Sequence, residues 1–470
     1  MPHHFIQFRT VTSTTFKSLA IKPELLDSIA ALEYQTMTPV QAQGLPVILE
    51  GKDLLAQAKT GSGKTAAFAI GLLNKIDTRH YHTQAIVLCP TRELADQVSN
   101  EIRQLARNLA NTKVLTLCGG RPMGDQLASL ERSPHIVVGT PGRILKHAEK
   151  GSLKLDQLHI LVLDEADRML DMGFHQDIML IIDEMPIDRQ TLLFSATYPE
   201  QIKSISDAIQ RNPTDIRIES GQQESKIKQA FYQIRKGERC STLVALLHHH
   251  RPESTLVFCN RKNQCQELAD ELWQQGFHAR ALHGDLEQSD RDQLLTQFSN
   301  QSCSILVATD VAARGLDIKD LPLVVNYDLS TDPEVHIHRI GRTGRAGKSG
   351  IAATLFLEYE KFRVEAIAEA AGQPADYASI NSLKMRENFS LSPPMVTIAI
   401  NGGRKDKIRP GDILGALTAG DSLNGKQIGK IDIFDKNAYV AVQRPAAKQA
   451  LRILSEGKIK GRKFRIRKLG

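Results

Sequence analysis

The sequence predicts an α/β protein with two tandem parallel sheets and a small α+β domain at the C-terminal end. Short apolar runs alternate with helical stretches, a rhythm typical of parallel sheets wrapped by helices. The rhythm starts again near residue 221 and changes after residue 394, and a chain of 470 residues suffices for two or three cores. We therefore expect domains at residues 1–220, 221–375 and 395–470, with a linker at 376–394.

The composition is that of an ordinary soluble globular protein, with 24% charged and 41% apolar residues. The first residues lack the pattern of a signal peptide, and no apolar run approaches membrane length. The six cysteines are scattered without Cys-x-x-Cys spacing, which favours buried thiols in a reducing compartment over disulfides or zinc. We expect a cytoplasmic protein with no membrane partner.

Charge is distributed unevenly along the chain. Residues 395–470 contain 17 Lys and Arg against 6 Asp and Glu, a net charge of +11, whereas the preceding residues carry 43 against 47, a net charge of −4. This asymmetry predicts a polyanionic partner for the C-terminal segment, although a basic run is also a common solvated surface.

Six apolar runs predict the strands of the first sheet: DLLAQA from Asp53, AIVLCP from Ala85, VLTLCG from Val114, HIVVGT from His135, HILVLDE from His159 and TLLFSA from Thr191. Several of these runs end in polar or glycine-rich residues. The carboxyl ends of parallel strands meet at one edge of a sheet, so we expect the chemistry to gather there.

Residues 53–65 predict a phosphate-binding loop. A short apolar strand leads into a glycine-rich turn, and Lys64 and Thr65 then open an apolar helix. Glycines let backbone N–H groups face an anion, the lysine reaches the β- and γ-phosphates, and the threonine hydroxyl binds Mg²⁺. The strict pattern begins with glycine where this chain has Ala58, so a plain glycine-rich turn before a buried helix is the alternative interpretation.

Carboxylates follow the apolar run that begins at His159. A run of this kind is typical of a strand buried on both faces, and acidic groups at its C-terminal end fall where open parallel sheets bind ligands. Asp164 can hold Mg²⁺, and Glu165 can orient or deprotonate the attacking water, as phosphoryl transfer requires. The loop and the carboxylates together predict ATP and Mg²⁺ as cofactors.

Five further runs predict a second parallel sheet: STLVFCN from Ser254, ARALHGD from Ala279, SILVATD from Ser304, LVVNYD from Leu323 and AATLFL from Ala352. This part of the chain has no phosphate loop of its own. Two sheets with one nucleotide site imply that a cleft between the domains completes that site.

The C-terminal segment predicts the order strand, helix, strand, strand, helix, strand. This order is that of the ferredoxin-like arrangement, which RNA-recognition domains use. The six elements are expected at residues 396–400, 410–419, 428–434, 438–443, 445–454 and 463–469.

Taken together, the strings MTPVQ, AKTGSGKT, PTRELA, TPGR, DEAD, SAT, ATDVAARGLDI and HRIGRTGRAG resemble the DEAD-box family of ATP-dependent RNA helicases. The resemblance covers about Phe16 to Leu357 and implies two tandem RecA-like domains. It implies that Gln41 reads the adenine with Phe16 beneath the base, and that Asp317 binds the ribose. The remaining residues expected to bind ATP are those of the loop: Ala58, Lys59, Thr60, Gly61, Ser62, Gly63, Lys64 and Thr65.

The same resemblance implies contacts to the RNA backbone in both domains, made by Arg92, Gly119, Gly120, Thr140, Gly142, Arg143 and Thr309. Ser195 and Thr197 match the element that couples hydrolysis to RNA. Contacts to the backbone position an RNA without reading its sequence, so we expect the helicase core to be non-specific.

Arg342 and Arg345 in HRIGRTGRAG match the arginine fingers of the family. Positions three apart share one face of a helix, so both guanidinium groups can reach the γ-phosphate. An arginine finger contributes about 10³ to 10⁵ in rate. The alternative is a basic helix that only faces RNA. We expect the catalytic set to be Lys64, Glu165, Ser195, Thr197, Arg342 and Arg345.

The C-terminal segment resembles the RNA-binding domain of the bacterial DbpA (DEAD-box protein A) subfamily in GRKDKIRPGDILGALT and GKIKGRKFRIRK. The resemblance implies binding to a hairpin of 23S ribosomal RNA and a role in assembly of the large ribosomal subunit. VTIAI has no aromatic residue and AYVAVQ has only Tyr439, so we expect basic side chains and shape, rather than base stacking, to recognise the RNA. The candidates, some of which can be plain solubilising charge, are Arg404, Lys405, Lys407, Arg409, Lys458, Lys460, Arg462, Lys463, Arg465 and Arg467.

The sequence therefore predicts an RNA-dependent ATPase and helicase that locally unwinds structured RNA and is targeted to 23S ribosomal RNA and to precursors of the large subunit. Two alternatives stay open: an ATP-gated scaffold that clamps ribosomal RNA without productive unwinding, and a general RNA helicase without ribosomal specificity. A DNA translocase is disfavoured by the DEAD string and by Gln41 in MTPVQ. Self-association stays open.

Overall fold

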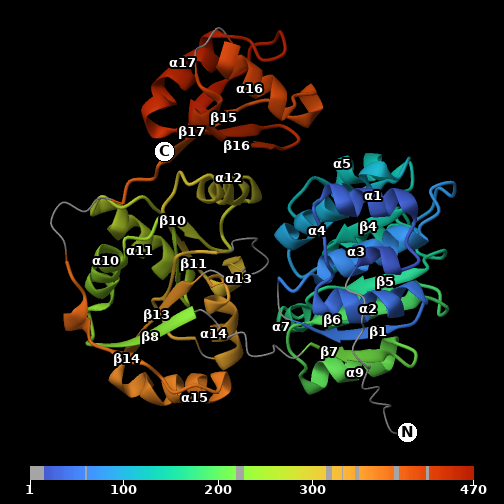
Figure 1. The fold of residues 1–470 in the computed structure, drawn as a ribbon, viewed down its shortest axis with the longest axis horizontal. Coiled ribbons are helices and arrows are strands. Elements are labelled where there is room, and N and C mark those ends of the chain that lie inside the picture. Colours follow the sequence, from blue (N-terminus) through green and yellow to red (C-terminus); the bar gives the residue numbers. More distant parts are fainter. Residues whose placement is uncertain are drawn as a thin grey trace. The chain divides into compact units, whose positions relative to one another are not determined.

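The computed structural model describes residues 15–58, 61–218, 227–313, 320–330, 332–344, 349–385, 391–419 and 423–469. The chain divides into two compact units (Figure 1), one built on the first sheet and one that contains the second and third sheets. Among the described residues, none of the helices combines the length and the apolar character needed to span a bilayer.

The first unit contains a seven-stranded parallel sheet in the order β3-β4-β2-β5-β6-β1-β7. Its strands are β1 (Leu54–Gln57), β2 (Ala85–Leu88), β3 (Val114–Leu117), β4 (Ile136–Gly139), β5 (Ile160–Leu163), β6 (Gln190–Ser195) and β7 (Thr214–Arg217). The six predicted strands are confirmed. The seventh, β7, is an edge strand in which only Ile216 is buried, so it carries no apolar run by which it could be predicted.

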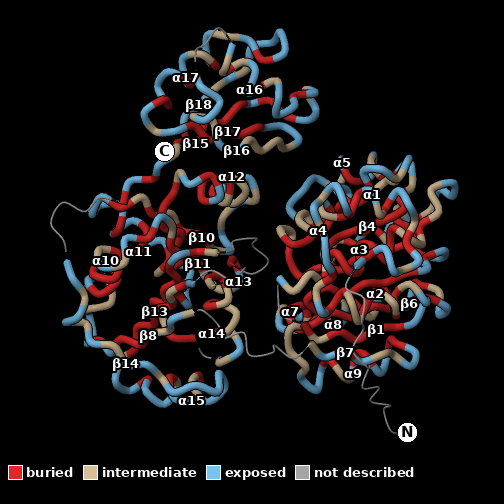
Figure 2. Tube along the Cα trace, in the orientation of Figure 1, coloured by how far each residue is buried: buried red, intermediate tan, exposed pale blue. Residues whose placement is uncertain are grey.

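Helices cover both faces of this sheet. One face packs against α1 (Pro23–Ala31), α2 (Pro39–Leu49), α3 (Lys64–Lys75) and α4 (Arg92–Leu105). The other packs against α5 (Met123–Leu130), α6 (Pro141–Glu149), α7 (Ala166–Asp171), α8 (His175–Asp183) and α9 (Glu200–Ile209). Successive residues of a strand point to opposite faces, which is why Leu54 and Leu55 belong to different cores. Figure 2 shows that burial is concentrated along the central strands.

The second sheet is also parallel, with seven strands in the order β10-β11-β9-β12-β13-β8-β14. They are β8 (Ile227–Ile234), β9 (Thr255–Phe258), β10 (Ala279–Leu282), β11 (Ile305–Ala308), β12 (Leu323–Asn326), β13 (Gly350–Leu357) and β14 (Tyr377–Ala378). The five predicted strands are confirmed, whereas β8 and β14 were not predicted. The segment 376–394, predicted as a linker, therefore contributes an edge strand to this sheet.

The helices around this sheet are α10 (Arg239–His250), α11 (Lys262–Gln274), α12 (Gln288–Ser299), α13 (Asp310–Ala313), α14 (Pro333–Ile340) and α15 (Lys361–Ala371). Apolar side chains of α10 and α11 fill the core on one face. On the other face, Val364 and Ile367 of α15 pack against Phe231 and Phe356.

The third sheet is antiparallel, in the order β16-β17-β15-β18. Its strands are β15 (Met395–Ile400), β16 (Ile428–Ile433), β17 (Ala438–Gln443) and β18 (Ile466–Lys468), and α16 (Pro410–Thr418) and α17 (Ala447–Glu456) pack on one of its faces. The element order and the strand order confirm the ferredoxin-like prediction. The last strand is shorter than the predicted 463–469.

Candidate active site

The phosphate loop follows β1 and leads directly into α3. Gly61 and Gly63 have φ of +84° and +92°, a region that favours glycine. A Cβ atom at Gly63 would lie 2.6 Å from Nε2 of Gln41 and 2.9 Å from Oγ1 of Thr38. Glycine is therefore required here both by the backbone and by the close approach of α2. The backbone N–H groups of the first turn of α3 are left to bind an anion.

Gln41 ties the phosphate loop to the start of α2. Its Oε1 accepts a hydrogen bond from the backbone N–H of Thr38 at 2.9 Å, and its Nε2 donates to the carbonyl oxygen of Gly63 at 3.1 Å. The residue is 4% exposed. Phe16 is equally buried and belongs to the core beneath this face of the sheet. Gln41 thus positions the loop, and its contact with a base stays a prediction.

Three buried polar side chains lie where β1 and β5 end. Lys64, Asp164 and Glu165 are 3–5% exposed. Among the described residues, Lys64 Nζ and Asp164 Oδ1 are buried without a hydrogen-bond partner. Burial raises the pKa of Asp164 to about 6; the charge of Glu165 adds to this rise and the charge of Lys64 opposes it. The cluster therefore contains one basic and one acidic atom, Lys64 Nζ and Asp164 Oδ1, that can still form hydrogen bonds with a ligand.

Glu165 is held at a strained turn. It has φ of +54° and stands at the N-terminal boundary of α7, immediately after β5. This left-handed conformation is uncommon for a residue with a Cβ atom and is often found at functional sites. Its carboxylate forms an ion pair with Arg168 at 2.9 Å, and both side chains are at most 5% exposed. The turn and the ion pair together fix the orientation of the carboxylate.

Asp167 connects the carboxylate cluster to the end of β6. Its Oδ2 accepts hydrogen bonds from the backbone N–H of Ala196 at 3.1 Å, and from the backbone N–H and the hydroxyl of Thr197 at 2.9 and 3.0 Å. No role was predicted for Asp167, because its partner Thr197 is 30 residues away in the chain. Ser195 beside them is fully buried and accepts, through its carbonyl oxygen, a hydrogen bond from Ala58 N–H at 3.0 Å.

The residues present fit ATP and Mg²⁺. A buried lysine without a partner suits the β- and γ-phosphates, and a buried carboxylate oxygen without a partner suits a divalent cation. Ser62 Oγ is likewise buried without a partner within the described part of the loop, and Thr65 is half-buried one residue after Lys64. When bound, Mg²⁺ would neutralise phosphate charge next to Thr65 and Asp164.

A second group of predicted residues meets at the carboxyl ends of β2, β3 and β4. Arg92 begins α4, and its guanidinium lies against the backbone of Gly119 and Gly120, where a Cβ atom at Gly120 would collide with it. Thr140 precedes α6, which contains Gly142. These strands are neighbours in the sheet, so the structure brings the predicted RNA contacts of this domain to one edge.

Arg143 also lies at this edge, where hydrogen bonds within the same domain hold its guanidinium group in place. Its Nη1 donates to Oε1 of Gln126 at 2.8 Å and to the carbonyl oxygen of Arg121 at 3.0 Å. Gln126 in turn donates to the carbonyl oxygen of Cys118 at 2.9 Å. Burial lowers the pKa of Arg143, and the neighbouring charge of Arg92 lowers it further. Two cations held side by side form a surface suited to phosphate groups.

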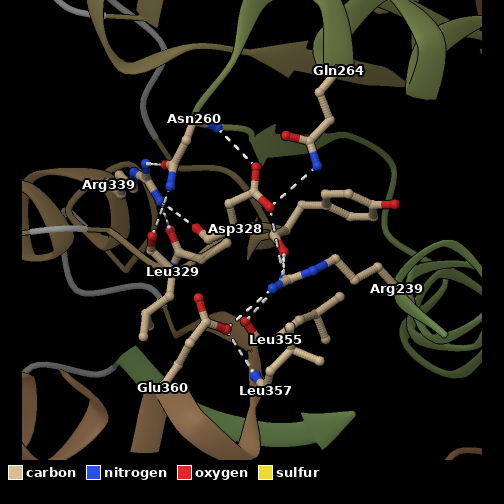
Figure 3. Close-up of polar contacts among 11 residues, drawn as sticks. Arg239, Asn260, Gln264, Asp328, Leu329, Arg339, Leu355, Leu357 and Glu360 are labelled. Atoms are coloured by element: carbon tan, nitrogen blue, oxygen red, sulfur yellow. Dashed lines mark hydrogen bonds and ion pairs between the residues drawn. The ribbon is translucent and has the colours of Figure 1, made fainter. Parts of the chain in front are cut away.

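In the second unit, Arg339 of α14 is the centre of a buried polar network (Figure 3). Its Nε and Nη2 donate to the two carboxylate oxygens of Asp310 at 2.6 and 2.7 Å. Nη2 also donates to Oδ1 of Asn260 at 2.8 Å, and Nη1 to the carbonyl oxygen of Asp328 at 2.7 Å. The side chain is 1% exposed. Arg339 therefore joins α14 to the ends of β9, β11 and β12.

Asp328 extends this network to a second arginine. Its carboxylate accepts hydrogen bonds from the backbone N–H of Asn260 at 2.9 Å and from Nε2 of Gln264 at 3.2 Å. Arg239 lies 3.8 Å from it and donates to Oε2 of Glu360 at 3.2 Å (Figure 3). Neither arginine was predicted as a functional residue, and the one signal in the sequence was the position of Arg339 inside HRIGRTGRAG.

Two predicted residues of this unit lie beside the network. Arg342 follows α14 and is 5% exposed, and its carbonyl oxygen accepts a hydrogen bond from Leu321 N–H at 3.2 Å. Thr309 directly precedes α13 and donates its backbone N–H to the carbonyl oxygen of Leu282 at 3.3 Å. Four other predicted residues lie outside the described residues: Lys59, Thr60, Asp317 and Arg345.

All ten basic candidates of the C-terminal domain are exposed. Most belong to two loops, 404–409 between β15 and α16 and 458–465 between α17 and β18. The loops lie side by side, because Lys460 Nζ donates to the carbonyl oxygen of Lys407 at 2.9 Å and Asn401 N–H donates to that of Arg465 at 2.9 Å. We call these two loops the basic patch. Arg467 lies outside it, on β18.

Three family models match the chain. Residues 38–205 match the DEAD/DEAH box helicase domain, residues 235–347 match the helicase conserved C-terminal domain, and residues 397–468 match the DbpA RNA binding domain.

Two curated relatives match along nearly their whole length. The chain is 52% identical over 460 residues to the ATP-dependent RNA helicase DbpA of Escherichia coli, covering 97% of this chain and 100% of the relative. It is 36% identical to the ATP-dependent RNA helicase DbpA of Bacillus subtilis, covering 96% and 99%.

Among solved structures, Dbp5 of S. cerevisiae bound to RNA and ADP BeF3 is similar with a TM-score of 0.73 and 30% identity, covering 79% of this chain and 97% of that chain. The chain therefore belongs to the DbpA family of DEAD-box ATP-dependent RNA helicases.

Proposed function

We propose that this ATP-dependent RNA helicase uses Mg²⁺, is directed by its C-terminal domain to a hairpin of 23S ribosomal RNA, and acts on precursors of the large ribosomal subunit. The observation that carries the proposal is the basic patch, two exposed loops of lysine and arginine held side by side on a domain of DbpA type. A helicase core that contacts only phosphates and sugars cannot choose its target, so the choice falls to this domain.

In the proposed reaction, Lys64 neutralises the β- and γ-phosphates while Thr65 and Asp164 hold Mg²⁺. Glu165, oriented by Arg168, positions the attacking water. The unpartnered buried atoms of Lys64 and Asp164 support these roles. Binding of the metal would favour the ionised form of Asp164, against the burial that raises its pKa.

Arg342 and Arg345 are proposed to stabilise the transferring phosphoryl group from the second helicase domain. The network around Arg339 supports this role for Arg342, because it fixes the helix that leads to this residue. Asp317 is proposed to bind the ribose, and Gln41 and Phe16 to contact the adenine.

RNA bound along the first domain would contact Arg92, Arg143 and the backbone at Gly119 and Gly120. The hydrogen bonds from Thr197 to Asp167 supply a route from the end of β6 to the carboxylate cluster.

We also propose a cytoplasmic location. The described cysteines are all free, which supports a reducing compartment.

The proposal is tested by steady-state ATPase activity with 23S ribosomal RNA, an unrelated structured RNA and duplex DNA. The variant Lys405→Gln/Lys463→Gln removes two charges of the basic patch, and Lys448→Gln/Arg452→Gln removes two exposed charges of α17 as the control. We expect strong stimulation by 23S RNA, weakened only in the first variant. Equal stimulation by every RNA in all three proteins would instead establish a general RNA helicase.

The scaffold alternative separates from the enzyme at Glu165. Glu165→Gln leaves Lys64 and the phosphate loop in place, so the variant should still bind ATP and RNA while hydrolysis stops. An enzyme that must recycle would fail to support assembly of large subunits in cells that carry this variant. A scaffold would support assembly normally.

A further inference from the structure

Trp273 is the single tryptophan of the chain, and it lies on the surface of the second helicase domain. It belongs to the last turn of α11, and its side chain is 43% exposed. Aromatic side chains that serve only a core bury nearly all of their large surface. An indole presented to solvent is therefore a candidate contact for a ligand that contains a flat ring.

The turn after α11 holds the indole in a fixed place. Gly276 has φ of +87°, and its N–H donates to the carbonyl oxygen of Trp273 at 3.0 Å. The N–H of Phe277 donates to the carbonyl oxygen of Leu272 at 2.9 Å, and both of these side chains are buried in the core. The two bonds form the Schellman motif, which ends a helix with a defined geometry. The chain then enters β10, an edge strand of the second sheet.

Two side chains that follow this turn orient the indole without covering it. The guanidinium carbon of Arg280 lies 4.2 Å from the centroid of the indole, and the ring of His278 stands nearly perpendicular to it at 5.4 Å between centroids. Together they leave 43% of Trp273 exposed. A cation–π contact stabilises one orientation of the aromatic plane. The indole is thus held ready, with an aromatic surface that a ligand can reach.

Positive charge surrounds this indole. Burial lowers the pKa of the His278 imidazole, and so, to a smaller extent, do three cations. In order of effect, these cations are Arg444, Arg280 and Lys468. They act on the imidazole that packs against Trp273, so a ligand stacked on the indole meets positive charge beside it. This combination suits a nucleotide, which has a flat base and an anionic phosphate.

The cations extend the basic patch toward the indole. The second loop of the patch ends at Arg465, and β18 then carries the chain to the exposed Lys468, about 10 Å further on. The indole is distinct from the predicted RNA contact at Thr309, because Trp273 lies where β10 begins and Thr309 follows the end of β11. Strands of four residues separate these two edges of the sheet by about 13 Å.

We propose that Trp273 and Arg280 form a stacking platform for an unpaired base of RNA that is bound at the basic patch. Stacking on an aromatic ring tolerates any base, and the cations attract the phosphate backbone. The platform therefore binds single-stranded RNA beside the target hairpin, and it supplies the stacking surface that β15 lacks. The path from the basic patch rests on the proposed function, whereas stacking at Trp273 does not depend on 23S RNA as the target.

The platform is tested first by the fluorescence of the full chain. Because the chain contains one tryptophan, emission excited beyond the absorption of tyrosine reports on this site alone. The protein is titrated without nucleotide with a single-stranded oligoadenylate, and binding is followed in parallel by the anisotropy of a fluorescein label on the RNA. We expect the emission to fall as the RNA binds, because a stacked base quenches the indole. Unchanged emission at saturating RNA would overturn the proposal.

Two variants then separate stacking from an indirect effect on the emission. Trp273→Leu removes the aromatic plane and keeps an apolar side chain, so we expect affinity for the oligoadenylate to fall about tenfold. Trp273→Phe keeps a ring and should restore most of this affinity. Tyr359→Leu removes a ring that is 73% exposed on the same domain, and as the matched control it should leave both the affinity and the quenching as they are.

Equal affinities of Trp273→Leu and Tyr359→Leu for the oligoadenylate would overturn the proposal, and would make Trp273 a plain surface contact of the edge strand. Thermal unfolding of each variant shows whether its fold is intact, and the first titration uses the unmodified chain and is free of this concern. Because the oligoadenylate contains no hairpin, neither measurement depends on whether 23S RNA is the target.

Discussion

The carboxylate of Asp167 holds Thr197 through two hydrogen bonds, one from the backbone N–H at 2.9 Å and one from the hydroxyl at 3.0 Å. Asp167 follows Glu165 by two residues on the same turn. We therefore expect a shift at the end of β6 to reach the segment that carries the proposed water-positioning carboxylate.

Replacing Thr197 with valine removes one of these bonds and preserves the shape of the side chain. A lost hydrogen bond to a charged group costs about 1.5–3 kcal/mol, so we expect RNA-stimulated kcat to fall about tenfold or more while KM for ATP is unchanged. Thr418→Val, which removes a hydroxyl bonded to the carbonyl oxygen of Leu414, is the control. Equal losses of basal and RNA-stimulated activity would refute a coupling role for this contact.

From the network around Arg339 we expect the planar shape of its guanidinium group, as well as its charge, to be needed for stability and activity. Arg339→Lys keeps a cation but cannot bond Asp310 through two nitrogens while also reaching Asn260. We expect the second helicase domain to lose about 3 kcal/mol of unfolding free energy and kcat to fall more than KM rises. Arg363→Lys, at a partly exposed position of α15, should leave the melting temperature and kcat as they are.

We expect alanine variants at two glycines, Gly63 and Gly124, to differ sharply in ATP binding. Gly63→Ala forces a Cβ atom into a backbone with φ of +92° and to within 2.6 Å of Gln41 Nε2, so the loop must move. Gly124→Ala adds a methyl group to α5 with nothing within 4 Å. Isothermal titration with ATP should show binding lost in the first variant and unchanged in the second. Normal binding in Gly63→Ala would mean that the loop tolerates the displacement of Gln41.

The strands that could be predicted are those with long apolar runs ending in polar residues, such as β2 and β5. Runs of this kind are dictated by burial on both faces of a parallel sheet. The strands β7, β8 and β14 escaped prediction for a related reason. β7 and β14 are edge strands, and β8 mixes Lys228 and Gln229 with its apolar residues.

Sequence motifs located the phosphate loop and the carboxylates, but they gave no roles to Asp167 and Arg339. These residues act through partners about 30 positions away, Thr197 and Asp310, and sequence spacing carries no information on such pairs. The burial of Thr397 and Ala399 on β15 escaped prediction for the opposite reason. The lack of aromatic residues on β15 indicated only that bases do not stack there, and not what covers the strand instead.

Because His336 of α14 is buried, we expect the free energy of unfolding of the second unit to be sensitive to acid. It is 1% exposed, its ring stacks on Phe231 at 5.9 Å between centroids, and its ring nitrogens contact Gln229 and Asn326. Burial, and to a smaller extent the charge of Arg339, lower the pKa of His336 to about 4. The native state therefore keeps this imidazole neutral at a pH at which an unfolded chain protonates it.

The sign of the effect follows from proton linkage. Between pH 6.5 and pH 4 the unfolded chain binds a proton at this site that the native state does not, so the free energy of unfolding falls as the pH is lowered. His336→Gln cannot titrate and should remove up to about 3 kcal/mol of that acid-dependent loss, whatever the replacement costs at neutral pH. Thermal unfolding of the second unit between pH 4.5 and 7.5 measures this, with His175→Gln on the exposed side of α8 as the control. An unchanged pH dependence in His336→Gln would show that the buried imidazole is not the group that limits stability in acid.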